Sequence, residues 1–222
     1  MMMSGVTRGL HCVAVLALWL LCANAHAARP VILVYGDSIS AAHGMDEDRG
    51  WAHLLSLRLQ RDNSPFRVVN ASASGETTDG GMIRLPKTLH MYQPAVVVLE
   101  LGGNDGLRGY PIDRIQGNLE QMVKLAKSSG ASVLLIGMVL PPNYGKRYTD
   151  AFSAIYPAVA AKSGVPFIPY LLDGVKTPRN LLQSDGIHPT PEAQPMIMKT
   201  VLKRLEPLLK QVKLKGHVAT HQ

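Results

Sequence analysis

Cysteine is almost absent from this chain. Its 222 residues include only Cys12 and Cys22, and both lie within the first 27 residues. If that segment is a removable leader, the remaining protein has no disulfide, no thiol nucleophile and no thiolate metal site. The apolar run near the start, Val13–Leu21, has nine residues, far fewer than the roughly 20 that a membrane-spanning helix needs.

The first 27 residues instead have the three parts of a secretory signal peptide. Arg8 supplies a positive charge, Val13–Leu21 is the apolar stretch, and Ala25-His26-Ala27 matches the small-x-small cleavage pattern. We expect cleavage after Ala27, which places the mature protein in the periplasm or outside the cell. A membrane anchor is the alternative, and the short apolar stretch disfavours it.

Several cofactor signatures are also missing. The chain has no H-E-x-x-H motif and no paired cysteines, so we expect no metal site. No G-x-G-x-x-G or G-x-x-x-x-G-K-[ST] loop follows the first strand, which disfavours nucleotide binding and predicts that no cofactor is needed. A G-x-S-x-G nucleophile elbow, typical of α/β-hydrolases, is absent too.

Positive charge is in excess, with a formal net charge of +7, and much of the excess lies near the C-terminus. The residues concerned are Lys199, Lys203, Arg204, Lys210, Lys213 and Lys215. No aromatic side chains are interleaved with them, so we expect a solvated helix face and a flexible basic tail at residues 213–222. A nucleic-acid or anionic-lipid patch is the less favoured interpretation, and we expect no nucleic-acid partner.

Apolar, β-branched runs alternate with stretches of helical spacing. Five runs read as strands buried on both faces: Val31–Val34, Arg67–Asn70, Ala95–Leu101, Ser132–Met138 and Pro166–Tyr170. The helical stretches are Trp51–Arg61, Thr78–His90, Asp113–Ser129, Tyr148–Ser163 and a final helix after Pro191. This order predicts one domain, residues 28–212, folded as a three-layer α/β/α sandwich around a mainly parallel, roughly five-stranded sheet.

Polar residues follow three of these strands. Gly36-Asp37-Ser38 comes after the first, Gly75 follows the second, and Gly102-Gly103-Asn104-Asp105 ends the third. Ligands of parallel sheets bind beyond the carboxyl ends of the strands. A serine hydroxyl, a glycine N–H and an asparagine amide there would suit a nucleophile with oxyanion donors. Each motif alone is equally compatible with a helix cap or a turn.

A candidate base and a candidate acid for the serine come from a later stretch, Ser184-Asp185-Gly186-Ile187-His188-Pro189. A serine nucleophile needs a base and an acid that orients the base, and His188 and Asp185 supply both. Pro189 disfavours helical geometry at His188, so we expect an extended loop before the final helix. By itself, the pair could also be a surface histidine beside a turn acid.

Taken together, these motifs resemble the four sequence blocks of the SGNH, or GDSL, hydrolase family. The order matches: Gly36-Asp37-Ser38, Gly75, Gly102-Gly103-Asn104-Asp105 and Asp185-x-x-His188. Further stretches, Glu100–Gly109, Pro142–Gly145 and Ala151–Pro157, are similar to the bacterial periplasmic esterases described as thioesterases, proteases or lysophospholipases. The resemblance runs from Pro30 to about Leu209.

This resemblance implies a flavodoxin-like fold and a set of site residues. It implies Ser38 as nucleophile, His188 as general base and Asp185 as the orienting acid, with Asp37 outside the triad. The oxyanion hole would comprise the backbone N–H groups of Ser38 and Gly75 and the side chain of Asn104. One departure is Ile39, where the family name has leucine.

The implied activity is hydrolysis of aryl esters, short- to medium-chain acyl esters, acyl thioesters and lysophospholipids. Nothing in the sequence requires an oligomer, so we expect a monomer. A carbohydrate O-acetylesterase and a non-catalytic lipid- or glycan-binding module are the alternatives. Met45, Leu107, Tyr110 and Pro141-Pro142 either line an acyl groove or pack the sheet edge.

Overall fold

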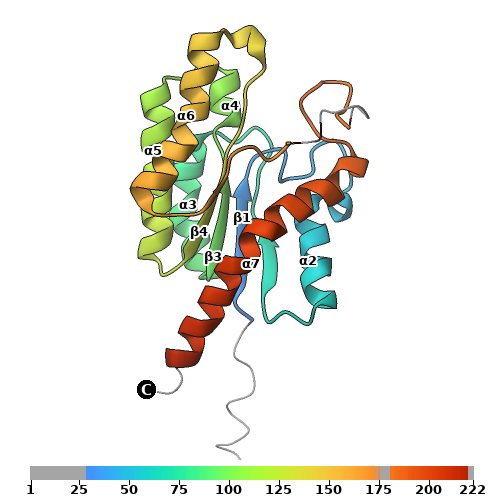
Figure 1. Cartoon of the computed structure of the whole chain (residues 1–222), viewed down its shortest axis with the longest axis vertical. Helices are drawn as coiled ribbons and strands as arrows, with labels where there is room; N and C mark the ends of the chain where they lie inside the picture. Colours follow the sequence, from blue (N-terminus) through green and yellow to red (C-terminus); the bar gives the residue numbers. More distant parts are fainter. Residues whose placement is uncertain (1–28, 174, 176–180, 220–222) are drawn as a thin grey trace, which may run out of the picture.

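A parallel five-stranded sheet forms the centre of the protein (Figure 1). The structure is a computed structural model that describes residues 29–173, 175 and 181–219. The strand order is β2-β1-β3-β4-β5 and every adjacent pair is parallel. The strands are β1 (Val31–Gly36), β2 (Arg67–Asn70), β3 (Val96–Glu100), β4 (Ser132–Ile136) and β5 (Phe167–Ile168).

Helices cover both faces of this sheet, which confirms the predicted three-layer sandwich. The α-helices are α2 (Trp51–Arg61), α3 (Thr78–Tyr92), α4 (Gly103–Leu107), α5 (Ile112–Ser128), α6 (Lys146–Ser163) and α7 (Gln194–Ala219). Three 3-10 helices are η1 (Glu47–Arg49), η2 (Pro142–Tyr144) and η3 (Pro191–Ala193). Helices α3, α5 and α6 pack on one face, and α2 and α7 pack on the other (Figure 1).

The continuous apolar runs follow from this two-sided burial. Along β1, Leu33 and Tyr35 contact the core beneath α3, α5 and α6, whereas Ile32 and Val34 contact the core beneath α2 and α7. Successive side chains of a strand point to opposite faces, so both sets must be apolar. Burying one such aliphatic side chain contributes about 1.5–3 kcal/mol to stability.

The topology also fixes where a ligand can bind. From β1 the chain crosses to β2 on one side and then returns to β3 on the other. The crossover helices α2 and α3 therefore lie on opposite faces, and a crevice opens at the carboxyl ends of β1 and β3. The turns after these two strands carry Ser38 and Asn104.

Three elements differ from the sequence expectation. β5 is limited to Phe167–Ile168 because Pro166 and Pro169 on either side lack an N–H for the ladder. The sequence does not predict α4, whose two glycines and Asn-Asp pair look like a loop. α7 continues to Ala219, so most of the segment expected to be a flexible tail is helical.

The predicted signal peptide, residues 1–27, lies outside the described residues. Within the part that the structure describes, no helix has both the length and the apolar composition needed to cross a bilayer.

Candidate active site

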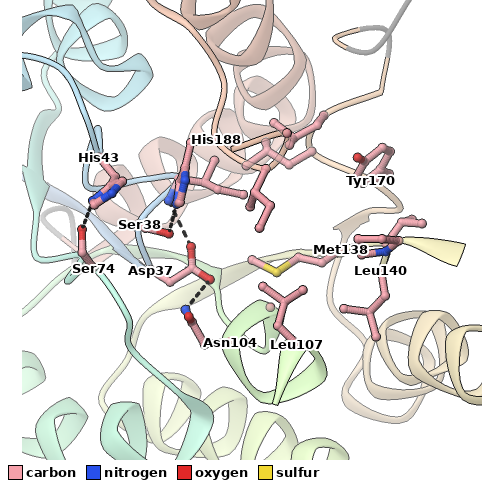
Figure 2. A pocket seen from close by; sticks show the side chains of 18 of the residues that line it. Asp37, Ser38, His43, Ser74, Asn104, Leu107, Met138, Leu140, Tyr170 and His188 are labelled. Carbon is pink, nitrogen blue, oxygen red and sulfur yellow. Dashed lines mark hydrogen bonds between the residues drawn. The ribbon is translucent and has the colours of Figure 1, made fainter. Parts of the chain in front are cut away.

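Ser38 lies on the turn that leaves β1, and its hydroxyl reaches the loop before α7. The Oγ of Ser38 is 2.8 Å from Nε2 of His188, and Nδ1 of His188 is 2.7 Å from Oδ2 of Asp185 (Figure 2 shows the Ser38–His188 bond). A carboxylate only accepts, so we assign the imidazole proton to Nδ1, which donates to Asp185. Nε2 is then free to accept the Ser38 proton.

Asp185 is fixed by three hydrogen bonds that it accepts. Besides the imidazole, the backbone N–H groups of Ile187 (2.8 Å) and His188 (3.0 Å) donate to its Oδ1. The bond from the His188 side chain, followed by these two backbone bonds, lowers the pKa of Asp185 to about 2. The carboxylate therefore stays charged beside the imidazole at neutral pH.

Hydrogen bonds fix the position of the loop that carries Asp185 and His188. Leu182 and Pro189 form an antiparallel bridge, and the N–H of Gln183 donates to the carbonyl of His188 at 2.7 Å. The side chain of Gln183 also donates to the carbonyl of His43 at 2.8 Å, which links this loop to the segment after Ser38. As predicted, the Asp185–His188 segment is a loop before the final helix.

Three hydrogen-bond donors surround the space beside Ser38. Among the described residues, the backbone N–H groups of Ser38 and Gly75 have no acceptor. Gly75 has φ of +78°, a conformation that favours glycine. The amide nitrogen of Asn104 donates to the carbonyl of Glu76 at 3.0 Å and to Oδ2 of Asp37 at 3.3 Å (Figure 2).

Asp37 is buried beneath this site. In the described structure it makes no hydrogen bond to His188. Its Oδ1 accepts the N–H of Ile39 at 3.1 Å, and its Oδ2 accepts the Asn104 amide. Burial, the largest effect, raises the pKa of Asp37 to about 6. The imidazole of His188 is hydrogen-bonded to Ser38 and to Asp185, and Asp37 lies outside this chain of bonds.

His43 is a member of the site that the sequence does not single out. Its ring lies 4.5 Å from the ring of His188, tilted by 40°. Its Nδ1 is 3.4 Å from the hydroxyl of Ser74, the residue before Gly75 (Figure 2). Nothing in the sequence indicates this contact, because His43 lies two residues before Met45 in a segment without clear periodicity.

An apolar cavity of about 340 Å³ opens next to Ser38 and His188. Its apolar lining comes from the turns after β1, β3, β4 and β5 and from the His188 loop: Ile39, Leu107, Met138, Val139, Leu140, Pro141, Tyr170, Leu171, Leu172 and Ile187. Figure 2 shows Leu107, Met138, Leu140 and Tyr170 on one side of the Ser38–His188 pair, with the Met138 side chain pointing towards the pair. The cavity therefore offers a path for an apolar chain that starts at Ser38.

The sequence predicts only part of this lining. Leu107 and Pro141 line the cavity, whereas Met45, Tyr110 and Pro142 do not. Tyr110 instead packs against the core beneath α5 and α6. Met138 is missed because the sequence places it in the strand expected over Ser132–Met138, whereas β4 ends at Ile136. Leu140 is missed because an apolar residue after a strand can either pack inward or face a cavity.

A serine hydroxyl, an imidazole and a carboxylate in one hydrogen-bonded chain, at the ligand edge of a parallel α/β/α sheet, define a serine hydrolase. Among the described residues, no group of three or more His, Cys, Asp or Glu side chains is placed to hold a metal ion.

Comparison with known proteins gives the family. The model of the GDSL-like lipase/acylhydrolase family matches residues 34–194. Esterase TesA of Pseudomonas aeruginosa is 51% identical over 183 residues, which cover 82% of this chain and 91% of TesA. The thioesterase 1/protease 1/lysophospholipase L1 of Escherichia coli K12 is 43% identical over 183 residues, covering 82% and 86%.

A solved structure is similar as well. The psychrotrophic esterase EstA from Pseudoalteromonas sp., in a structure inhibited by monoethylphosphonate, has a TM-score of 0.78 and 34% identity, and the match covers 81% of this chain and 98% of EstA. The chain belongs to the GDSL-like lipase/acylhydrolase family, and it is a carboxylic ester hydrolase.

Proposed function

We propose that the protein hydrolyses acyl esters and thioesters through an acyl-enzyme formed on Ser38. The observation that carries this proposal is the Ser38–His188–Asp185 hydrogen-bond chain at the mouth of an apolar cavity. Ser38 acts as the nucleophile, His188 as general base and then acid, and Asp185 as the group that orients His188.

The reaction proceeds in two displacements. His188 Nε2 takes the hydroxyl proton as Ser38 Oγ bonds to the carbonyl carbon, and the same proton then passes to the departing alcohol or thiol as its bond to carbon breaks. Water next attacks the acyl group while His188 accepts its proton. The proton returns to Ser38 Oγ as the free acid leaves.

Negative charge develops on the carbonyl oxygen in both displacements. The N–H groups of Ser38 and Gly75 receive it, and the amide of Asn104 contributes by sharing with the oxyanion the hydrogen that also points to Asp37 Oδ2 at 3.3 Å. The lack of an acceptor for either backbone N–H among the described residues supports this role. Each such donor contributes a factor of about 10²–10³ in turnover.

We propose that the substrates are aryl esters, short- to medium-chain acyl esters, acyl-CoA and lysophospholipids. The apolar lining favours an acyl chain over a sugar, because an apolar wall leaves sugar hydroxyl groups without hydrogen-bond partners. The names of relatives, such as thioesterase and lysophospholipase, agree with this set.

We also propose that the protein is exported as a monomer with one domain, residues 28–212. The leader pattern of residues 1–27 in the sequence supports the export. One sheet with a core on each face supports the single domain. N-terminal sequencing of the protein from the periplasmic fraction should begin at Ala28. An intact Met1 in that fraction would contradict the cleavage.

A serine-directed organophosphonate tests the proposed nucleophile. We expect one adduct per molecule, located on the peptide that contains Ser38, with parallel loss of activity. Ser38→Ala should take up no reagent, whereas Ser56→Ala on α2 should react like the wild type. An adduct on another residue would overturn the assignment.

A further inference from the structure

Glu100, the last residue of β3, is a buried acid for which the proposed reaction has no use. Its side chain is fully buried, and it lies opposite Gly36 in the register of β1 and β3. A Cβ on Gly36 would overlap Oε2 of Glu100 and would lie 2.9 Å from the Oγ of Ser40. Gly36 has no positive φ, so the absence of a side chain there serves to admit the Glu100 carboxyl group.

One oxygen of Glu100 holds the segment that carries Ser38. Oε2 accepts the backbone N–H of Asp37 at 3.2 Å and the hydroxyl of Ser40 at 2.6 Å. These two donors are the residue before Ser38 and the second residue after it. The other oxygen, Oε1, receives no hydrogen bond from a described residue.

No basic side chain compensates this buried acid within the described structure. None of the ion pairs includes Glu100 or Asp37. The titratable groups that face the pair are Asp105 of α4, Tyr156 of α6 and His188 of the loop before α7. Two adjacent buried carboxylates without a cation repel each other and lose hydration, so one of them must keep a proton.

The proton belongs on Glu100. Burial and then the charge of Asp37 raise the pKa of Glu100 well above its usual range. The geometry agrees, because both oxygens of Asp37 accept hydrogen bonds, from Ile39 and Asn104, whereas Oε1 of Glu100 accepts none from a described residue. Asp37 is then the member of the pair that ionises.

An ionised Asp37 connects this pair to the oxyanion donors. Its carboxylate accepts the amide of Asn104 and the N–H of Ile39, the residue after Ser38. Glu100, Asp37 and Asn104 thus form a continuous hydrogen-bonded series beneath Ser38.

We propose that Glu100 is a positioning residue that keeps its proton during turnover and, through Asp37 and Ser40, holds Ser38 and Asn104 in their reactive arrangement. This proposal rests on the proposed function of Ser38 and Asn104. It assigns Glu100 no contact with the substrate.

The test compares Glu100→Gln with Glu100→Ala, using butyrate ester hydrolysis per folded molecule. Glutamine is neutral, and its amide oxygen can still accept from the N–H of Asp37 and the hydroxyl of Ser40, so kcat should stay within about threefold of the wild type. Alanine removes these bonds and should lower kcat by about 10- to 100-fold with little change in KM, less than the loss of a whole oxyanion donor. Glu206→Gln on α7 is the matched control and should leave kcat and melting temperature unchanged.

The kcat and KM values test the positioning role, and the melting temperature separately tests whether Glu100 keeps its proton. In the wild type, the folded state must keep a proton on Glu100 that the unfolded chain releases as pH rises above the usual carboxyl pKa. The difference in melting temperature between Glu100→Gln and the wild type should therefore shift in favour of Glu100→Gln from pH 4 to pH 8. This measurement decides the protonation state even if Glu100→Ala does not fold.

Several outcomes overturn the proposal. A kcat for Glu100→Gln as low as that of Glu100→Ala would mean that Glu100 works as an anion. A kcat near the wild type in both variants, or a difference in melting temperature that does not change with pH, would equally contradict it. If the proposed function itself fails, the results differ from these: the wild type is then inactive, or Ser38→Ala retains activity.

Discussion

His188 Nε2 lies 2.8 Å from Ser38 Oγ, although the two residues are 150 positions apart in the chain. Ser38 lies on the turn after β1, and His188 lies on the loop before α7. The two residues therefore come together only when the sheet is complete. The same edge of the sheet supplies Asn104 after β3 and the apolar wall after β4. A site assembled from separate strand ends depends on the whole domain being folded.

Asp185→Asn should lower kcat by about 10²–10⁴-fold with a much smaller effect on KM, because the imidazole loses its orienting carboxylate. The measurement is steady-state hydrolysis of a butyrate ester. Asp46→Asn, on the exposed segment before η1, is the control and should behave like the wild type. Full activity of Asp185→Asn would remove Asp185 from the proposed triad.

The contribution of Asp185 to stability should depend on pH in a defined window. Its folded-state pKa of about 2 lies below the value of 3.8 for an ordinary aspartate, so its stabilising effect is complete above about pH 4 and is lost as pH falls towards 2. The melting temperature of Asp185→Asn should therefore lie below that of the wild type by a constant amount from pH 8 to about pH 4. A difference that disappears between pH 7 and pH 5 would contradict the lowered pKa.

Two glycine substitutions should have opposite effects on the free energy of unfolding. Gly36→Ala places a methyl group against Glu100 and Ser40 and should destabilise the fold by about 1–3 kcal/mol. Gly117→Ala lies inside α5 with no atom within 4 Å of the new methyl group, and it should stabilise the fold by about 0.5–1 kcal/mol. Urea unfolding measures both, and a stabilised Gly36→Ala would contradict the packing described for Glu100.

A larger side chain in the cavity wall should change the preference of the enzyme for acyl chains of different length. Leu107→Phe fills space beside Met138 in the path that leads from Ser38 (Figure 2). We expect kcat/KM for octanoate to fall about 5- to 20-fold relative to butyrate, since each displaced methylene group forfeits about 0.8 kcal/mol. The control is Leu57→Phe on the exposed face of α2. An equal loss on both esters would show that the acyl chain lies elsewhere.

The strands and the proposed triad could be predicted because their signals are local. β1 and β3 are continuous apolar runs, and the Asp185-x-x-His188 spacing lies within one short loop. The boundaries of α2 and β2 are likewise as predicted. The parallel topology then follows from the alternation of strands and helices.

Residues whose role depends on register could not be predicted in this way. Glu100 is one acid at the end of an apolar strand, and its function depends on its pairing opposite Gly36 in β1. The role of Gly36 depends on the same pairing, because its missing side chain leaves space for Glu100. His43 is similar, because its contact with His188 joins two loops that are distant in the chain.

Release of p-nitrophenol from butyrate and octanoate esters tests the central claim most directly. The purified wild type should hydrolyse both, Ser38→Ala should lose most of the turnover while keeping the wild-type melting temperature, and Ser56→Ala should match the wild type. Hydrolysis by a folded Ser38→Ala at the wild-type rate would contradict the account. Hydrolysis of acetylated sugars in place of both esters would favour a carbohydrate O-acetylesterase.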